Sequence, residues 1–215
     1  MKRLLLVLKF HTVVFLTFEA GADIKEMAEL TFPQTRNFIN HWDGITKIRK
    51  PVIAAVNGIC CGGGLEWALS ADIILAAEHA TFALPEIRSG TVADAASIKL
   101  PKRIPYHIAM DMLLTGRWLD AEEAAKWGLI NYIYPAQNLM DEAHKLGELL
   151  ASGPPLVYAA IKEIVREAEN MKFQEALNKI TKSQFESVEK LYRSEDQIEG
   201  ARAFAEKREP NWKGC

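Results

Sequence analysis

The most constraining feature of this sequence is a short apolar run that is followed by glycines. Val52–Val56 is apolar at every position, as expected for a strand buried on both faces of a sheet. Asn57-Gly58 and Gly62-Gly63-Gly64 follow, then a short helical segment at residues 65–69 and a second apolar run at residues 73–77. Strand, glycine turn, helix and strand predict a βαβ-like unit, and therefore a mainly parallel sheet covered by helices.

Capping signals in the second half of the chain predict helices. Asp120 and Glu123 have the spacing at which an N-cap carboxylate accepts the backbone N–H three residues on. Gly128 is expected to end that helix, and residues 129–134 are a strand candidate. Pro154-Pro155 and the capping pair Ser194 and Gln197 mark the beginnings of two further helices. We therefore expect an α/β core over residues 1–140 and a helical region over residues 141–215.

Charge and cysteine content exclude several classes of protein. The 215 residues carry 26 Lys and Arg against 28 Asp and Glu, a net charge of −2, so no overall basic field exists to hold nucleic acid or an anionic membrane. Three cysteines, Cys60, Cys61 and Cys215, cannot form a disulfide framework. They fit a reducing compartment, and we expect a cytoplasmic protein.

The N-terminus resembles the beginning of an export signal, but the pattern is incomplete. Met1-Lys2-Arg3 precedes an apolar run at residues 4–8, and Lys9 and His11 interrupt it. The run is also shorter than the ~20 residues that a membrane span needs. Residues 13–17 favour extended structure, so one or two buried strands are the alternative.

Residues 57–90 contain the candidate chemistry. Glycines 62–64 expose backbone N–H groups ahead of a helix, an arrangement that can bind an oxyanion. Glu66 lies in the first turn of that helix, and Glu86 follows a strand-loop passage. Two carboxylates beside such N–H groups can move protons next to a carbonyl. Each feature also has a structural interpretation, as a tight glycine turn or as a carboxylate that interacts with the helix dipole.

Other chemistries lack their residues. No Gly-Lys-Ser/Thr follows Gly64, and Trp67 stands where a dinucleotide fingerprint needs glycine. No G-x-S-x-G elbow occurs. The histidines have no metal-ligand spacing, and Cys60 and Cys61 are expected to be buried small hydrophobic residues.

Several motifs together resemble the crotonase superfamily, the enoyl-CoA hydratases and isomerases. They are Lys50–Gly58 (KPVIAAVNG), residues 20–27 (AGADIKEM), 62–66, 82–86 (FALPE), 114–117, 121–124, 127–131 and 194–214. The resemblance implies a core of ββα repeats arranged as a spiral, followed by C-terminal helices for trimerisation and active-site cover. It implies a CoA-thioester substrate, with no metal and no separate cofactor, in a homotrimer or hexamer.

The resemblance also implies roles for individual residues. Glu66 and Glu86 occupy the two catalytic positions, and the backbone N–H groups of Ala22 and Gly63 occupy the oxyanion-hole positions. The implied positions for substrate and CoA binding are Ala20, Asp23, Ile24, Lys25, Gly62, Phe204 and Lys207. Isomerase members often lack the first glutamate, so both together favour addition or loss of water across the α,β bond. The C-terminal motifs are similar to those of members that act on trimethylammonio acyl-CoA.

Two departures leave alternatives open. Family members begin with a strand hairpin and a helix ahead of the signature loop, whereas residues 1–18 do not resemble that start, so we expect an N-terminally incomplete core. Residues 90–97 are one residue shorter than in the family, which alters the expected acyl pocket. The alternatives are an enoyl-CoA isomerase and a non-catalytic acyl-CoA-binding remnant.

Overall fold

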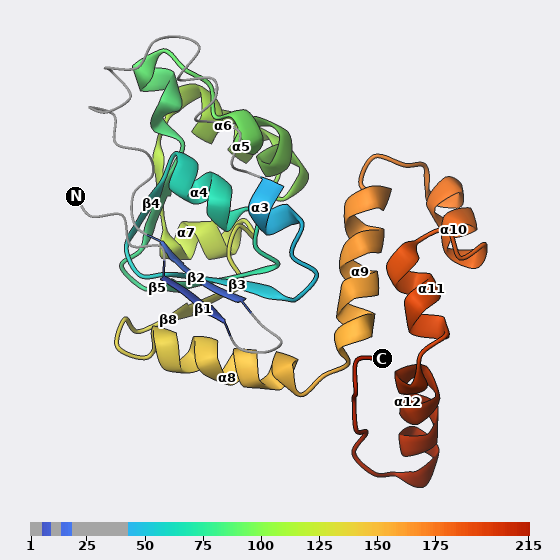
Figure 1. Ribbon diagram of the computed structural model, residues 1–215. Coiled ribbons are helices and arrows are strands. Elements are labelled where there is room, and N and C mark those ends of the chain that lie inside the picture. The colour runs from blue at the N-terminus through green and yellow to red at the C-terminus, as the bar shows by residue number, and fades with distance from the viewer. Residues whose placement is uncertain (1–5, 10–13, 19–42) are drawn as a thin grey trace. The chain divides into compact units, whose positions relative to one another are not determined.

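The computed structural model describes residues 6–9, 14–18 and 43–215 (Figure 1). The described chain forms two compact units. The first extends to Gly147, and the second contains Glu148–Cys215 together with the short segment Arg49–Pro51.

The larger sheet of the first unit has five strands. In sheet order they are β1 (Leu6–Lys9), β2 (Val14–Phe18), β3 (Val52–Val56), β5 (Ile73–Ala77) and β8 (Tyr132–Tyr134). β1 pairs antiparallel with β2, and the other neighbours are parallel. The predicted parallel pairing of the two apolar runs is therefore confirmed, and the N-terminal residues include the two alternative strands. The predicted strand at residues 129–134 is shorter, because only its last three residues join the sheet.

A second sheet was not expected from the apolar pattern. It contains β4 (Ile59–Cys61), β6 (Thr81–Ala83) and β7 (Trp118–Asp120), in that order. The chain leaves β3, turns at Asn57-Gly58 and enters β4 before the helix, so the predicted strand-turn-helix unit is in fact two strands followed by a helix. β5 and β6 repeat this order. The ββα repeat that the family resemblance implied is present.

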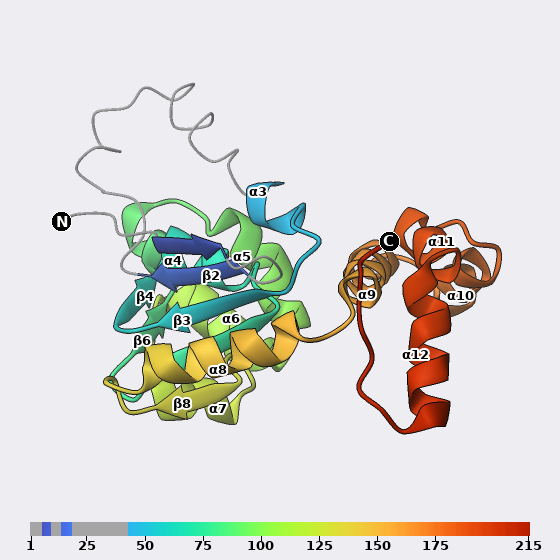
Figure 2. The ribbon, with the colours of Figure 1, turned by 60° about the horizontal axis from the view of Figure 1, so that its bottom comes forward.

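The described residues of the first unit also form a set of helices. They are α3 (Asp43–Thr46), α4 (Gly63–Ala68), η2 (Pro85–Ser89), α5 (Asp94–Lys99), η3 (Leu100–Lys102), α6 (Tyr106–Thr115), α7 (Ala121–Lys126) and α8 (Leu139–Ala151). Figures 1 and 2 show α4 on one face of the sheet and α8 along the other. The core between these layers is apolar, and Leu65, Phe82 and Leu100 are fully buried in it. Asp120 accepts the Glu123 N–H at 2.7 Å, which confirms the predicted cap of α7.

The second unit is entirely helical among its described elements. It contains α9 (Pro155–Ala168), α10 (Phe173–Thr181), α11 (Glu186–Tyr192) and α12 (Glu195–Glu206). Ala160, Phe185 and Val188 form its buried centre. The predicted cap of α12 is confirmed, because the Ser194 hydroxyl accepts the Gln197 N–H at 3.2 Å.

Candidate active site

Glu66 lies in the first turn of α4 and is only 4% exposed. The helix begins directly after Gly62, whose N–H donates to the Ala83 carbonyl of β6 at 3.0 Å. Gly62 has φ 55° and ψ −132°, a conformation that an L-residue rarely adopts. The glycine therefore lets the chain pass from β4 into α4 within one residue, and this turn buries the Glu66 carboxylate.

Glu86 lies in the first turn of η2, immediately after the second sheet. A Cβ atom added to Gly62 would lie 2.9 Å from Glu86 Oε1, so the carboxylate packs directly over this glycine. Glu86 Oε2 is buried and has no hydrogen-bond partner among the described residues. Because buried carboxylate oxygens are nearly always hydrogen-bonded, an unpartnered one marks a place for a water or a substrate.

Both glutamates have pKa values above the ordinary range. Burial is the main cause for each, because it disfavours the charged carboxylate. The charge of Glu86 raises the pKa of Glu66 further, and Asp94 raises the pKa of both. Two carboxylates that repel each other in a buried site tend to hold one proton between them. That state provides one acid and one base.

The N-terminal part of α5 contacts Glu66 from a segment 30 residues further along the chain. The Ala96 N–H donates to Glu66 Oε1 at 2.9 Å, and this bond acts to lower the pKa of the carboxyl. Asp94, two residues earlier, is half-buried, and its negative charge raises the pKa of both glutamates. α5 thus orients the Glu66 carboxylate. It also acts on the pKa of Glu66 in both directions, since the Ala96 bond lowers it and the Asp94 charge raises it.

The other predicted site residues fall into three groups. Gly63 is the first residue of α4, where helix geometry leaves the backbone N–H without an intrahelical partner. Ala20, Ala22, Asp23, Ile24 and Lys25 lie outside the described residues. Phe204 and Lys207 belong to the second unit, at α12: Phe204 is 88% exposed, and Lys207 ends the helix with φ 53°. The structure therefore brings together Gly62, Glu66 and Glu86.

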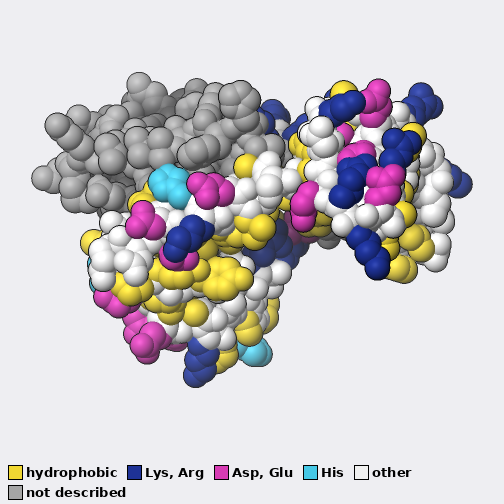
Figure 3. Space-filling view, turned by 90° about the horizontal axis from the view of Figure 1, so that it is seen from below, with side chains coloured by type: hydrophobic (Ala, Val, Ile, Leu, Met, Phe, Trp, Pro, Cys, Tyr) yellow, Lys and Arg dark blue, Asp and Glu magenta, His cyan; other side chains and the backbone are white. Residues whose placement is uncertain are grey.

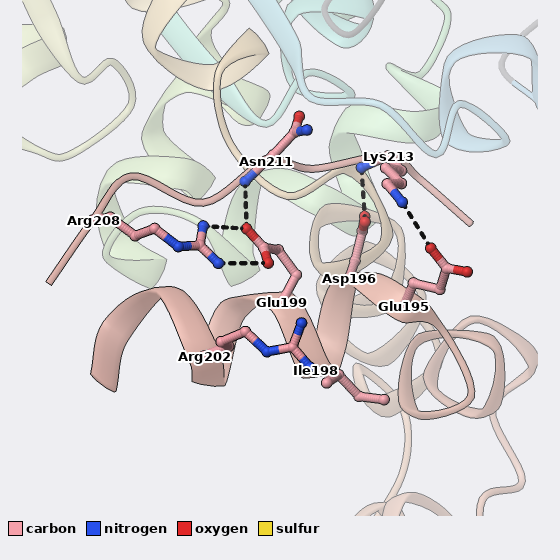
Figure 4. A pocket seen from close by; sticks show the side chains of 8 residues that line it. All are labelled: Glu195, Asp196, Ile198, Glu199, Arg202, Arg208, Asn211 and Lys213. Carbon is pink, nitrogen blue, oxygen red and sulfur yellow. Dashed lines mark hydrogen bonds and ion pairs between the residues drawn. The ribbon is translucent and has the colours of Figure 1, made fainter. Parts of the chain in front are cut away.

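A hollow of about 470 Å³ opens in the second unit, and its lining includes neither glutamate of the site. Figure 4 shows its charged side chains directed at one another and at the C-terminal segment. Glu199 accepts two bonds from Arg208, at 2.6 and 2.9 Å, which hold the pKa of Glu199 at about 2. Buried Asp196 accepts the N–H groups of Lys213 and Gly214. These bonds fasten residues 208–215 to α12.

The remaining expectations concern metals, membranes and thiols. No cluster of three or more metal-ligating side chains occurs among the described residues. Within the same residues, no helix is both long and apolar enough to cross a membrane. On the face drawn in Figure 3, basic and acidic side chains alternate over the described surface of the second unit. Cys60 is buried as predicted and its pKa is raised by burial, whereas Cys61 is half-buried.

Sequence reasoning missed the residues that surround the glutamates. Asp94 and Ala96 were part of a segment noted only for its length, and neither lies in a motif that signals a contact with Glu66. Ser70, in the turn after α4, and Lys99, at the end of α5, bond to each other and were missed for the same reason. The spacing between the contacting residues, 29 or 30 positions, leaves no local pattern to detect.

This arrangement can carry out acid–base chemistry on a bound carbonyl compound. The buried pair Glu66 and Glu86 can exchange protons, and the N–H groups at the beginning of α4 can stabilise negative charge on an oxygen. The chain belongs to the enoyl-CoA hydratase/isomerase family, whose model matches residues 13–215.

Among curated relatives, this chain is similar to the carnitinyl-CoA dehydratase of Citrobacter koseri. The two are 45% identical over 201 residues, which is 92% of this chain and 77% of the relative. The crystal structure of an enoyl-CoA hydratase from Bacillus anthracis is 32% identical, with a TM-score of 0.87 over 95% of this chain and 82% of that one. The enoyl-CoA hydratase structure from Mycobacterium marinum is 35% identical, with a TM-score of 0.80 over 95% and 81%.

The charge of Asp94 leads to a prediction about pH dependence. Asp94→Asn is expected to lower the pKa of both Glu66 and Glu86, because it removes a negative charge that favours their protonated forms. Both limbs of the pH profile of kcat/KM should therefore move to lower pH. Glu122→Gln, which neutralises an exposed carboxylate of α7, is the matched control and should leave the profile in place. If both limbs of the profile stay in place in Asp94→Asn, the charge of Asp94 does not act on the two glutamates.

Proposed function

We propose that this chain is a hydro-lyase that adds or removes water across the α,β bond of a CoA thioester, with carnitinyl-CoA and crotonobetainyl-CoA as the substrate pair. The observation that carries this proposal is the carboxylate of Glu86: its Oε2 is buried and has no partner among the described residues, its Oε1 lies over Gly62, and its charge raises the pKa of Glu66. Two carboxylates that share one proton can hold a water between them. An isomerase needs only one proton-shuttling group, so the pair favours hydration.

The proposed mechanism uses one ionised and one protonated glutamate. In hydration, the ionised carboxylate takes a proton from the water as its oxygen adds to the β-carbon. The protonated carboxyl then delivers its proton to the α-carbon. In dehydration the roles reverse. Between the two steps the thioester oxygen carries negative charge. It accepts hydrogen bonds from the backbone N–H groups of Gly63 and Ala22, and each bond should stabilise the transition state by about 3 kcal/mol.

The substrate proposal rests on the named relatives and on the C-terminal motifs. The carnitinyl-CoA dehydratase relatives are 43% to 45% identical to this chain. We assign Ala20, Asp23, Ile24, Lys25, Phe204 and Lys207 to the binding of the CoA part, on the family resemblance alone. CoA enters as part of the substrate, so the proposed reaction needs no cofactor. Cys60, Cys61 and Cys215 form no disulfide bond, which supports a cytoplasmic location.

A hydration assay tests the proposal directly. The purified chain should convert crotonobetainyl-CoA to carnitinyl-CoA, measured as loss of the enoyl-thioester absorbance and by mass of the product. Crotonyl-CoA is the comparison substrate. Tight binding of either ester without turnover would instead support the non-catalytic remnant, and migration of a double bond without uptake of water would support the isomerase.

We propose that the chain assembles as a homotrimer or as a hexamer of two trimers. Large apolar side chains of the second unit are exposed in the single chain, among them Val165, Phe173 and Phe204, at 61%, 80% and 88%. An exposed apolar face gains stability when a partner covers it. Light scattering should therefore give a mass of three or six times 24.1 kDa. A stable monomer with full activity would contradict the assembly.

A further inference from the structure

Two links join α5 to α4 and to the turn that follows α4, beside the candidate active site. In the first, the Ala96 N–H donates to Glu66 Oε1 at 2.9 Å. In the second, Lys99 Nζ donates to Ser70 Oγ at 2.6 Å. Ser70 lies four residues after Glu66, and Lys99 lies three residues after Ala96. Ser70 lies in the turn directly after α4, and Lys99 is the last residue of α5, so the second link lies about one turn beyond the first.

Ser70 connects the second link back to Glu66. Its hydroxyl donates to the backbone carbonyl oxygen of Glu66 at 3.0 Å while it accepts from Lys99. Ser70 is 9% exposed and Lys99 is half-buried, so the charged bond between them is shielded from water. The proposed reaction uses neither side chain.

Apolar packing holds α5 against the core through Ala93, Ala96 and Leu100, but the helix itself contributes little to fixing its register. It has only six residues, and its N-cap, Ala93, provides no side-chain hydrogen bond. Residues 87–92, which precede it, are exposed. A helix this short has almost no stability of its own, so its register depends on its tertiary contacts. The backbone N–H groups of Ala95 and Ala96 reach Glu66 only while that register holds.

We propose that Lys99 and Ser70 are positioning residues that hold the backbone N–H groups of α5 on the Glu66 carboxylate. Their bond fixes α5 against α4, and the Ala96 N–H in turn fixes the direction and the acidity of Glu66. The consequence for the reaction rests on the proposed function, since it requires that Glu66 moves a proton.

Paired substitutions test this role through kinetics. Lys99→Met and Ser70→Ala should each lower kcat for hydration of crotonyl-CoA by about tenfold to a hundredfold, as expected for a small misplacement of a reacting group, with KM nearly unchanged. Lys99→Arg and Ser70→Thr keep the donor and the acceptor and should restore most of the rate. The matched controls are Lys102→Met and Ser97→Ala, at exposed positions of the same segment, which should behave as the unsubstituted chain.

A measurement of the Glu66 pKa distinguishes loss of the Ala96 hydrogen bond from loss of the Lys99 charge. Among the described residues, Glu86 and Asp94 are the charged groups that act on the pKa of Glu66, and both raise it. Lys99 bonds to Ser70 rather than to Glu66, and loss of its positive charge would by itself act to raise that pKa as well. Ser70→Ala keeps that cation, so a raised pKa in Ser70→Ala as well as in Lys99→Met reports loss of the Ala96 bond. A shift in Lys99→Met alone, or in neither, overturns the proposal. Should Lys99→Met fail to fold, Lys99→Gln replaces it.

A titration without turnover keeps this test independent of the proposed function. Carbon-detected NMR of the side-chain carboxyl groups, with the Glu66 signal assigned through Glu66→Gln, measures the pKa in each variant. If the unsubstituted chain does not hydrate enoyl-CoA, the proposed function fails and the titration still decides on positioning. If it hydrates and both variants match it in rate and pKa, the positioning role alone is overturned.

Discussion

Replacing Glu66 or Glu86 by glutamine is expected to lower kcat by about 10² to 10⁴, the usual contribution of a group that transfers a proton in the transition state. Glutamine keeps the shape and the hydrogen-bonding oxygen but cannot exchange the proton. Affinity for the CoA ester should change little, because the loss falls on the transition state. The measurement is steady-state hydration of crotonobetainyl-CoA, with ligand binding determined separately by calorimetry.

Stability provides the control for these variants. A buried carboxyl with a raised pKa favours the folded state only while it is protonated, and that contribution is lost as the pH rises through the folded pKa. Glu66→Gln should therefore unfold at the same or a higher temperature than the unsubstituted chain at pH 7. The difference in unfolding temperature should vanish below about pH 4, where the Glu66 carboxyl is protonated in both the folded and the unfolded chain. Full activity in both glutamine variants would exclude the mechanism, and a lower unfolding temperature would assign the lost activity to misfolding.

Gly62→Ala is expected to lower kcat/KM by about a hundredfold and to cost about 1–3 kcal/mol of stability. The new Cβ would lie 2.9 Å from Glu86 Oε1, so the carboxylate must move away from its place over the beginning of α4. The backbone adds strain, because φ 55° with ψ −132° is unfavourable for alanine. Hydration kinetics and thermal unfolding measure the two effects.

Gly58→Ala is the matched control for this substitution. Gly58 lies in the turn before β4, and an added Cβ there would contact nothing within 4 Å. The variant should keep the activity and the unfolding temperature of the unsubstituted chain. If Gly62→Ala loses stability but retains its turnover, the close approach of Glu86 to Gly62 does not matter for the reaction.

Local sequence patterns were sufficient to predict several elements of the first unit, though not its second sheet. The apolar runs of β3 and β5 gave two parallel strands, and the Asp120–Glu123 spacing gave the cap of α7. The family motifs implied the ββα repeat and the two glutamates. These inferences succeed because strand burial and helix capping depend on residues close together in the chain.

The groups available for chemistry, a glycine turn and two glutamates, can be identified in the amino-acid sequence alone. Their positions and their pKa values depend on how the chain packs. β4 and β6 were not predicted, because strands of three residues are too short to show a hydrophobic periodicity. The approach of Glu86 to Gly62, the Ala96 bond to Glu66 and the Lys99 bond to Ser70 join positions 24 to 30 residues apart. Such contacts exist only after the sheets and helices have packed. Burial and neighbouring charge, which raise the pKa of both glutamates, likewise arise from that packing.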